Sequence, residues 1–193
     1  MEPEKASFFS IVVDIIETLV VAAAIFVIVY LFLLQPHQVK GASMEPNFHD
    51  GDYILTDKIS YRFGPPQRGD VIIFKSPTDP DVDFIKRVIG LPGETVKISD
   101  GKVIIINDQN KNGFTLKEPY QTNGPTTGGQ QAPENTAIKI GTGQYFVLGD
   151  NRLESFDSRS WGLLPKKNII GKAWLRYWPL NEFGFIKHPR YSN

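Results

Sequence analysis

The sequence predicts a mainly β protein in which a single N-terminal transmembrane helix precedes an antiparallel β-sheet or barrel-like domain. Two observations predict this fold class. Residues 18–34 carry no charged side chain, and a helix of about 20 apolar residues is long enough to cross a bilayer. After Lys40 the chain changes to short segments rich in β-branched and aromatic residues, separated by Gly, Pro and Asp without intervening helical patterns.

The first expected element is an uncleaved anchor over residues 11–35, preceded by a short tail over residues 1–10. A cleaved signal peptide usually has an apolar core of about 7–15 residues behind a basic segment. Here the apolar run is longer, and the acidic residues of the tail outnumber Lys5. A buried core helix that is apolar on all faces is uncommon in so small a domain. Pro36 ends the helix because the residue before a proline disfavours helical geometry.

Residues 36–193 are expected to form the β domain. Within it, Asp100-Gly101 predicts a tight hairpin, and Pro165–Asn168 predicts one helical turn. Residues 108–136 are rich in Asn, Gln, Gly, Thr and Pro, so we expect an inserted polar loop, exposed to solvent and ordered only in part. The expected strands are Asp52–Ile59, Asp70–Lys75, Val82–Ile89, Thr95–Ser99, Lys102–Asn107, Ala137–Ile140, Gln144–Leu148 and Ile170–Trp178.

Composition excludes several classes of site. The 21 basic and 21 acidic residues balance, so no polybasic surface for nucleic acid is expected. The absence of cysteine excludes disulfides, thiol nucleophiles and cysteine metal sites. The histidines, His37, His49 and His188, lack the spacing of metal ligands, so we expect neither a metal nor another cofactor.

Ser43 and Lys86 are the candidate reactive residues. A serine hydroxyl becomes a good nucleophile when a neighbouring base removes its proton, and a buried lysine with a lowered pKa can be that base. Because side chains alternate along a strand, Lys86 shares its face with apolar residues, whereas Arg87 falls on the other face. Taken alone, the lysine is more consistent with a strand-edge side chain that reaches solvent, and the serine is also consistent with a turn residue.

Four motifs occur in order along the chain: Ser43-Met44-Glu45-Pro46 just beyond the apolar segment, then residues 83–90, 149–152 and 155–159. Together they resemble type I signal peptidases, also called leader peptidases, a family of membrane proteases with a serine/lysine dyad. The resemblance runs from the apolar segment to near Gly171. It implies a membrane-bound serine endopeptidase that removes N-terminal signal peptides from exported preproteins after small residues, in the pattern Ala-x-Ala.

The resemblance also implies roles for individual residues. Ser43 would be the nucleophile and Lys86 the general base, with the Ser43 N–H as one oxyanion donor. Some members carry a serine as a second donor where this chain has Gly41, which leaves that donor open. Ser155 would hydrogen-bond the lysine amine. The remaining supporting residues would be Asp157 and Arg159, as an ion pair that braces the loop, and Gly149, Asp150 and Asn151, which shape the neighbouring turn.

Shallow apolar pockets would explain the choice of small residues, because a larger side chain clashes in them. An extended substrate would add as a strand beside Val82–Ile89. For every pocket residue, ordinary core packing is the competing interpretation. The candidates by position in the motifs are Val39, Met44, Phe48, Phe84 and Ile85.

Lys5 and Lys40 flank the apolar segment on opposite sides, so charge does not set its orientation. The resemblance implies a short cytoplasmic tail and a single-pass protein of the cell membrane, with its catalytic domain on the non-cytoplasmic side. In a cell with an internal membrane such as a thylakoid, that membrane is a second expected location. The expected partners are exported preproteins and membrane lipid, without nucleic acid.

Two other readings stay open at this point. One keeps the dyad in a self-cleaving regulator, a class that usually carries a DNA-binding domain where this chain has the apolar segment. The other is a membrane-anchored β domain that binds extended peptides without catalysis. A buried, neutral Lys86 amine within hydrogen-bond distance of Ser43 would separate an enzyme from a binding domain.

Overall fold

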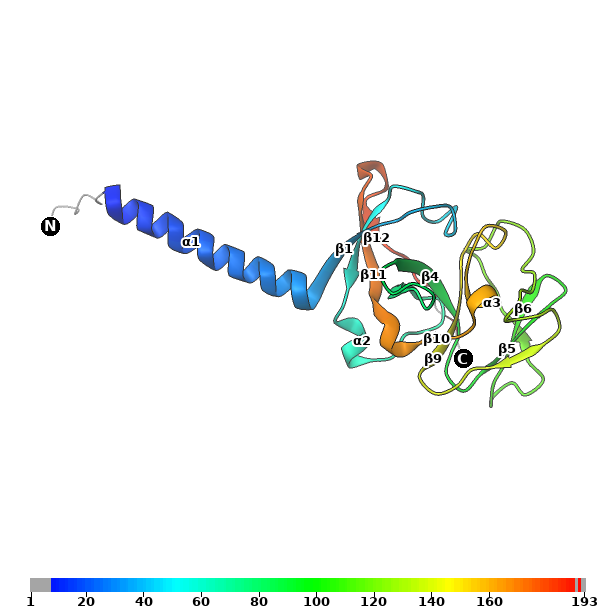
Figure 1. The fold of residues 1–193 in the computed structure, drawn as a ribbon. Coiled ribbons are helices and arrows are strands. Elements are labelled where there is room, and N and C mark those ends of the chain that lie inside the picture. Colours follow the sequence, from blue (N-terminus) through cyan, green and yellow to red (C-terminus); the bar gives the residue numbers. More distant parts are fainter. Residues whose placement is uncertain (1–7, 190, 192–193) are drawn as a thin grey trace.

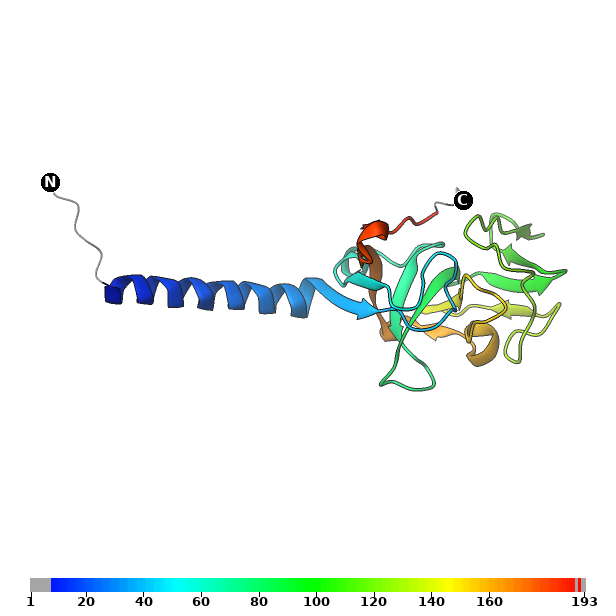
Figure 2. The same cartoon turned by 90° about the horizontal axis from the view of Figure 1, so that it is seen from above.

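The computed structural model describes residues 8–189 and residue 191. The apolar segment forms α1 (Phe8–Ile28), which continues through a π-helical turn, η1 (Val29–Leu33), into the β domain. The helix extends away from that domain in both views (Figures 1 and 2), and none of its side chains is buried. Its length and composition suffice to cross a membrane. Most of the expected tail lies outside the described residues, and the helix begins inside its range, at Phe8.

The larger sheet carries the candidate reactive residues. Its strands are all antiparallel, and the last long strand of the chain, β11, lies between β2 and β3. A short β12 pairs with β11. The order across the sheet is β1 (Leu34–Gln38), β2 (Tyr53–Asp57), β11 (Ile169–Trp178), β3 (Val71–Lys75), β4 (Asp83–Gly90), β9 (Gln144–Leu148) and β10 (Leu164–Pro165), with β12 at Gly184–Phe185.

The smaller sheet lies on the side of the domain away from α1 (Figure 1). Its β5–β6 hairpin turns at Asp100 and Gly101, which both have positive φ values, 51° and 75°. This confirms the expected tight turn, since such hairpins require left-handed residues. The order is β7 (Phe114–Thr115), β6 (Lys102–Ile106), β5 (Thr95–Ser99) and β8 (Ala137–Lys139).

Helix outside the apolar segment is confined to single turns in the described residues. The expected turn appears as η2 (Lys166–Asn168), while α2 (Ser60–Phe63), α3 (Ser158–Trp161) and η3 (Leu180–Glu182) were not expected. The prediction of a mainly antiparallel β protein behind one apolar helix is confirmed.

Two expectations about the β domain need correction. The expected anchor reached residue 35, but the helical segment ends at Leu33 and residues 34–38 form β1, an edge strand that tolerates the missing N–H of Pro36. Residues 108–136 are not simply an exposed loop. Leu116 and Tyr120 from this segment are buried in the core between the smaller sheet and β9, and Ala132 joins them. The polar segment therefore covers part of the core.

Candidate active site

Ser43 lies in the turn-rich segment between β1 and β2. Gly41 has a positive φ of 80°, which glycine adopts without steric cost, and its N–H donates to Asp50 Oδ1 at 2.7 Å. Asn151 holds the segment from the other side: its backbone N–H donates to the Ser43 carbonyl and its side-chain amide to the Ala42 carbonyl, each at 3.1 Å. The position of the serine is thus set by hydrogen bonds to its backbone.

Lys86 extends from β4 to this serine. Its amine donates to Ser43 Oγ at 2.7 Å and to the Ile85 carbonyl at 2.9 Å. The residue is 4% exposed. Burial lowers the pKa of Lys86 to about 8, although the negative charges of Asp157 and Asp150 act to raise it. The amine is therefore placed to accept the serine proton, and at mildly alkaline pH it is uncharged in a large fraction of the molecules.

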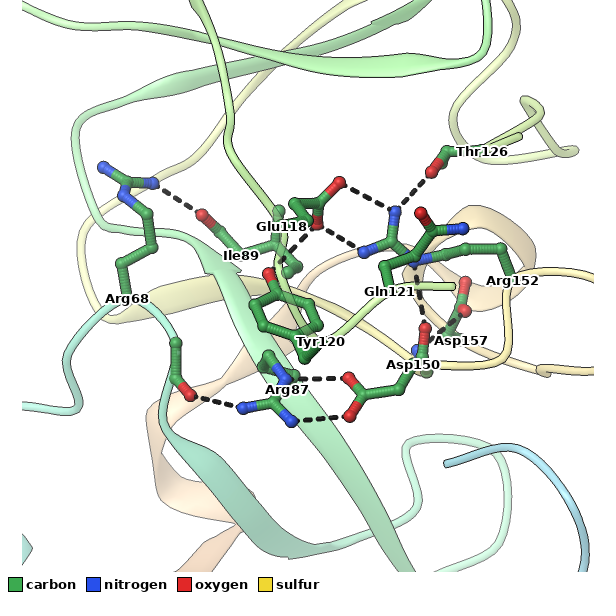
Figure 3. Close-up of polar contacts among 12 residues, drawn as sticks. Arg68, Arg87, Ile89, Glu118, Tyr120, Gln121, Thr126, Asp150, Arg152 and Asp157 are labelled. Carbon is green, nitrogen blue, oxygen red and sulfur yellow. Dashed lines mark hydrogen bonds and ion pairs between the residues drawn. The ribbon is translucent and has the colours of Figure 1, made fainter. Parts of the chain in front are cut away.

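Arg87 points to the opposite side of β4, as expected from the alternation, and pairs with Asp150 (Figure 3). Its Nε donates to Asp150 Oδ1 at 2.7 Å and its Nη2 to Oδ2 at 2.5 Å. Both side chains are buried, and the guanidinium lies 4.0 Å from the centre of the Tyr120 ring. Asn47 donates to the same carboxylate at 2.9 Å. Because Asp150 precedes Asn151, the buried pair fixes the segment that holds the serine.

Asp157 and Arg159 form the expected ion pair, with two contacts of 2.8 Å between guanidinium and carboxylate. Asp157 also caps α3 by accepting from the Arg159 N–H, and it accepts from the Gly149 N–H at 3.1 Å. A Cβ at Gly149 would lie 2.2 Å from Ser155 Oγ and 2.4 Å from the Ser43 carbonyl oxygen. Only glycine fits between these groups.

The expected hydrogen bond from Ser155 to the Lys86 amine is not formed. Ser155 Oγ is buried and has no hydrogen-bond partner among the residues that the structure describes. The amine is instead directed to Ser43 Oγ and to the Ile85 carbonyl. Ser155 therefore lies beside the site, and its hydroxyl does not orient the Lys86 amine in this arrangement.

Arg152 links the site to the polar segment 108–136, a connection that sequence reasoning missed (Figure 3). Its guanidinium makes an ion pair with Glu118, with one contact at 3.0 Å, and also donates to the Thr126 hydroxyl. Its Nε donates to the Gly149 carbonyl at 3.0 Å. The signal available in the sequence was the placement of Glu118 and an aromatic residue inside an otherwise small and polar segment.

A cavity of about 340 Å³ opens between β4 and the segment after β1, with Ser43 and Lys86 in its wall. Met44 and Phe48 do not line this cavity, because they pack in the core beneath the serine segment. Sequence reasoning missed apolar walls such as Phe156, whose ring meets the Phe84 ring edge to face. The expected pocket residues that do line the cavity are Val39, Phe84 and Ile85.

Comparison with known proteins decides the family. The family model described as "Signal peptidase, peptidase S26" matches residues 12–178. The chain belongs to this family. Its members are serine peptidases that hydrolyse peptide bonds, and the matched range includes the serine segment, β4 and the 149–159 loop.

Two relatives and one solved structure illustrate the similarity. Signal peptidase I from Leptolyngbya laminosa is 42% identical over 82% of this chain and 75% of its own length. Probable signal peptidase I-2 from Synechocystis is 36% identical over 88% of this chain and 75% of its own length. A crystal structure of signal peptidase I from Enterococcus faecalis is 34% identical, covers 55% of this chain and 95% of its own, and has a TM-score of 0.44.

One histidine of this signal peptidase family member lies in a group with the composition of a metal site. Ligand atoms of His49, Asp52 and Glu182 lie within 4.8 Å of one another. Arg176 forms ion pairs with both carboxylates, so its guanidinium supplies the positive charge that a metal ion would otherwise bring. The expectation that His49 does not bind metal stays a prediction.

Proposed function

We propose that this peptidase cleaves N-terminal signal peptides from exported preproteins with Ser43 as the nucleophile and Lys86 as the general base. The observation that carries the assignment is the 2.7 Å contact between the Lys86 amine and Ser43 Oγ. A base must lie within hydrogen-bond distance of the proton that it removes, and its pKa should be near the working pH. The lowering of the Lys86 pKa to about 8 meets the second condition.

In the proposed reaction, Ser43 Oγ attacks the carbonyl carbon before the cleaved bond while its proton passes to the Lys86 amine. The charged amine then gives this proton to the departing nitrogen, and the mature protein leaves. Lys86, neutral again, takes a proton from water, whose oxygen attacks the acyl-enzyme ester. The amine then gives this proton to Ser43 Oγ as the ester bond breaks, which releases the signal peptide and restores the free enzyme. The Ser43 N–H is the proposed donor to the oxyanion; Gly41 has no side chain to add a second.

The edge of β4 supports the proposed binding of substrate as an added strand. Residues 83–86 pair with β3 on one side, whereas the ladder to β9 begins only at Arg87. The other backbone edge of residues 83–86 therefore faces the cavity, where a peptide can hydrogen-bond to it. Val39 and Ile85 narrow the same cavity with apolar side chains, which supports a preference for Ala-x-Ala.

We further propose that residues 11–35 anchor the peptidase in a membrane, with residues 1–10 in the cytoplasm and residues 36–193 on the other side. An apolar helix of suitable length supports the anchor. The cell membrane, or an internal membrane such as a thylakoid, would then be the location. Because η1 leads directly into β1 and Ser43 follows β1, the site would lie close to the bilayer surface.

The test is to incubate the detergent-solubilised protein with a preprotein and to sequence the new N-terminus. We expect cleavage after Ala-x-Ala. Ser43→Ala, Lys86→Ala and the double variant should each lose nearly all activity, by similar factors, because the two groups act as a unit. Lys86→Arg should fail as well, since guanidinium stays charged. Lys102→Ala, at an exposed lysine on β6, is the matched control. Substantial cleavage by purified Lys86→Ala would contradict the assignment.

A further inference from the structure

A group of basic residues lies where the β domain meets α1, outside the candidate active site. Lys58 follows β2, Arg62 belongs to α2, and Lys166 begins η2. Together with Tyr61, they line a cavity of about 260 Å³ whose remaining walls include Ile169. We call this cavity the cationic pocket. Two of its basic residues are four positions apart in sequence, and the fold brings Lys166 to them from a distant segment.

The cationic pocket is close to the end of the apolar segment. The Lys58 N–H donates to the carbonyl of Leu33, the last residue of η1, at 2.9 Å. The neighbouring pair in the β1–β2 ladder joins Leu34 to Asp57. Figure 1 shows α2 beside the point where the helix enters the domain. If α1 crosses a bilayer, these contacts hold the cationic pocket at the level of the lipid headgroups.

Two of the cations that line the cationic pocket, Arg62 and Lys166, are available to an anion from outside the protein. Arg62 and Lys166 are exposed, and neither forms an ion pair with any residue in the described part of the chain. The nearby Asp57 carboxylate accepts hydrogen bonds from the Ile59 and Ser60 amides and from the Ser60 hydroxyl. It is thus engaged in shaping the start of α2 rather than in pairing with Arg62 or Lys166.

The residue that ends α2 gives the same region an apolar side chain. Phe63 is 87% exposed and directly follows Arg62. An aromatic ring next to cations is a combination that favours the boundary between headgroups and acyl chains, where the ring enters the apolar layer and the cations meet phosphates. In water, a ring exposed to this extent contributes no hydrophobic stabilisation.

We propose that the cationic pocket binds the phosphate of an anionic lipid headgroup in the bilayer that holds α1. This inference rests on the membrane anchoring proposed above. Basic residues attract anionic lipid when they lie within a Debye length of its surface, and these residues are fixed beside the end of the helix. Bound lipid would add a second attachment point beside the connection through η1, and so limit rotation of the β domain about the helix axis.

The test measures lipid binding by the full-length protein in detergent, by native mass spectrometry during titration with phosphatidylglycerol or phosphatidylcholine. We expect the wild-type protein to prefer phosphatidylglycerol. Arg62→Gln/Lys166→Gln should weaken phosphatidylglycerol binding by about 25-fold, at about fivefold for each cation removed near the lipid. The matched control is Lys102→Gln/Lys139→Gln, which removes two exposed lysines from the smaller sheet. Its affinity should stay at the wild-type value.

The proposal would be overturned by equal affinity of wild-type protein for both lipids, by unchanged phosphatidylglycerol binding in Arg62→Gln/Lys166→Gln, or by an equal loss in the control. Displacement of the lipid by inorganic phosphate at comparable concentration would also overturn it, because the pocket would then be a site for free phosphate. Cleavage of a soluble Ala-x-Ala peptide, measured on the same samples, reports separately on the proposed peptidase activity and on folding.

Discussion

Raising the pH from about 7 to about 9 should increase kcat/KM for peptide cleavage about tenfold, with a midpoint near the pKa of Lys86. With that pKa lowered to about 8, the neutral fraction of the amine is about 9% at the lower pH and about 91% at the higher. A lysine with an ordinary pKa of about 10.4 would still be almost fully charged at pH 9. The burial of Lys86 is therefore what makes its amine a base at these pH values.

The assay is initial-rate cleavage of a short peptide without ionisable groups near the cut, at constant ionic strength, with circular dichroism at each pH to verify folding. We expect a plateau above about pH 9. A profile that is flat from acidic to alkaline pH, or one that is still rising steeply above about pH 10, would refute the reasoning. In the first case Lys86 is not the base; in the second its pKa is not lowered.

The lowered pKa of Lys86 also predicts an effect on stability: it favours catalysis but destabilises the folded protein at low pH. The folded-state pKa of Lys86 lies below its unfolded value, so the charged form is disfavoured by folding. The resulting loss of stability is full below about pH 8, declines as the pH rises toward about 10.4, and vanishes above it. Its size is roughly 3 kcal/mol. The stability difference between Lys86→Met and wild-type protein, from urea unfolding, should therefore change with pH across this window.

Three substitutions test the surroundings of the dyad. Gly149→Ala should lower both stability and activity, because its Cβ would overlap the Ser43 carbonyl; unchanged melting and rates would contradict this. Ser155→Ala should leave the melting temperature, measured by calorimetry, unchanged or higher, because the substitution removes a buried hydroxyl that has no hydrogen-bond partner. Asp150→Asn should cost about 3–5 kcal/mol in urea unfolding by leaving Arg87 buried without its anion, and Arg87→Met/Asp150→Leu should recover part of that loss. Equal losses in the single and double variants would argue against charge as the cause.

Strands were the most predictable part of the fold. Alternation placed Lys86 and Arg87 on opposite faces of β4, and the structure has them there, with one reaching Ser43 and the other Asp150. The β5–β6 hairpin was equally clear because only a few residues adopt the left-handed turn at Asp100. These features depend on neighbouring residues, which is why a single sequence reveals them.

The remaining features depend on residues that are distant in sequence. Pro36 marked the end of the helix, but nothing near it in sequence indicated that residues 34–38 form an edge strand, because that strand depends on pairing with β2. The polarity of residues 108–136 suggested exposure, but Arg152 neutralises Glu118 inside the protein. Ser155 was assigned a partner by motif, whereas its hydroxyl is buried without a hydrogen-bond partner among the described residues.

The position of β11 in the larger sheet has a consequence for the order of synthesis. Ser43 follows β1 and precedes β2, while Lys86 lies on β4 next to β3, and β11 stands between β2 and β3. A ribosome makes the serine and the lysine before it makes Ile169–Trp178. Until that strand emerges, β2 and β3 lack the strand that pairs with both of them in the finished sheet. We therefore expect the arrangement that places Ser43 beside Lys86 to be complete only after β11 has been made.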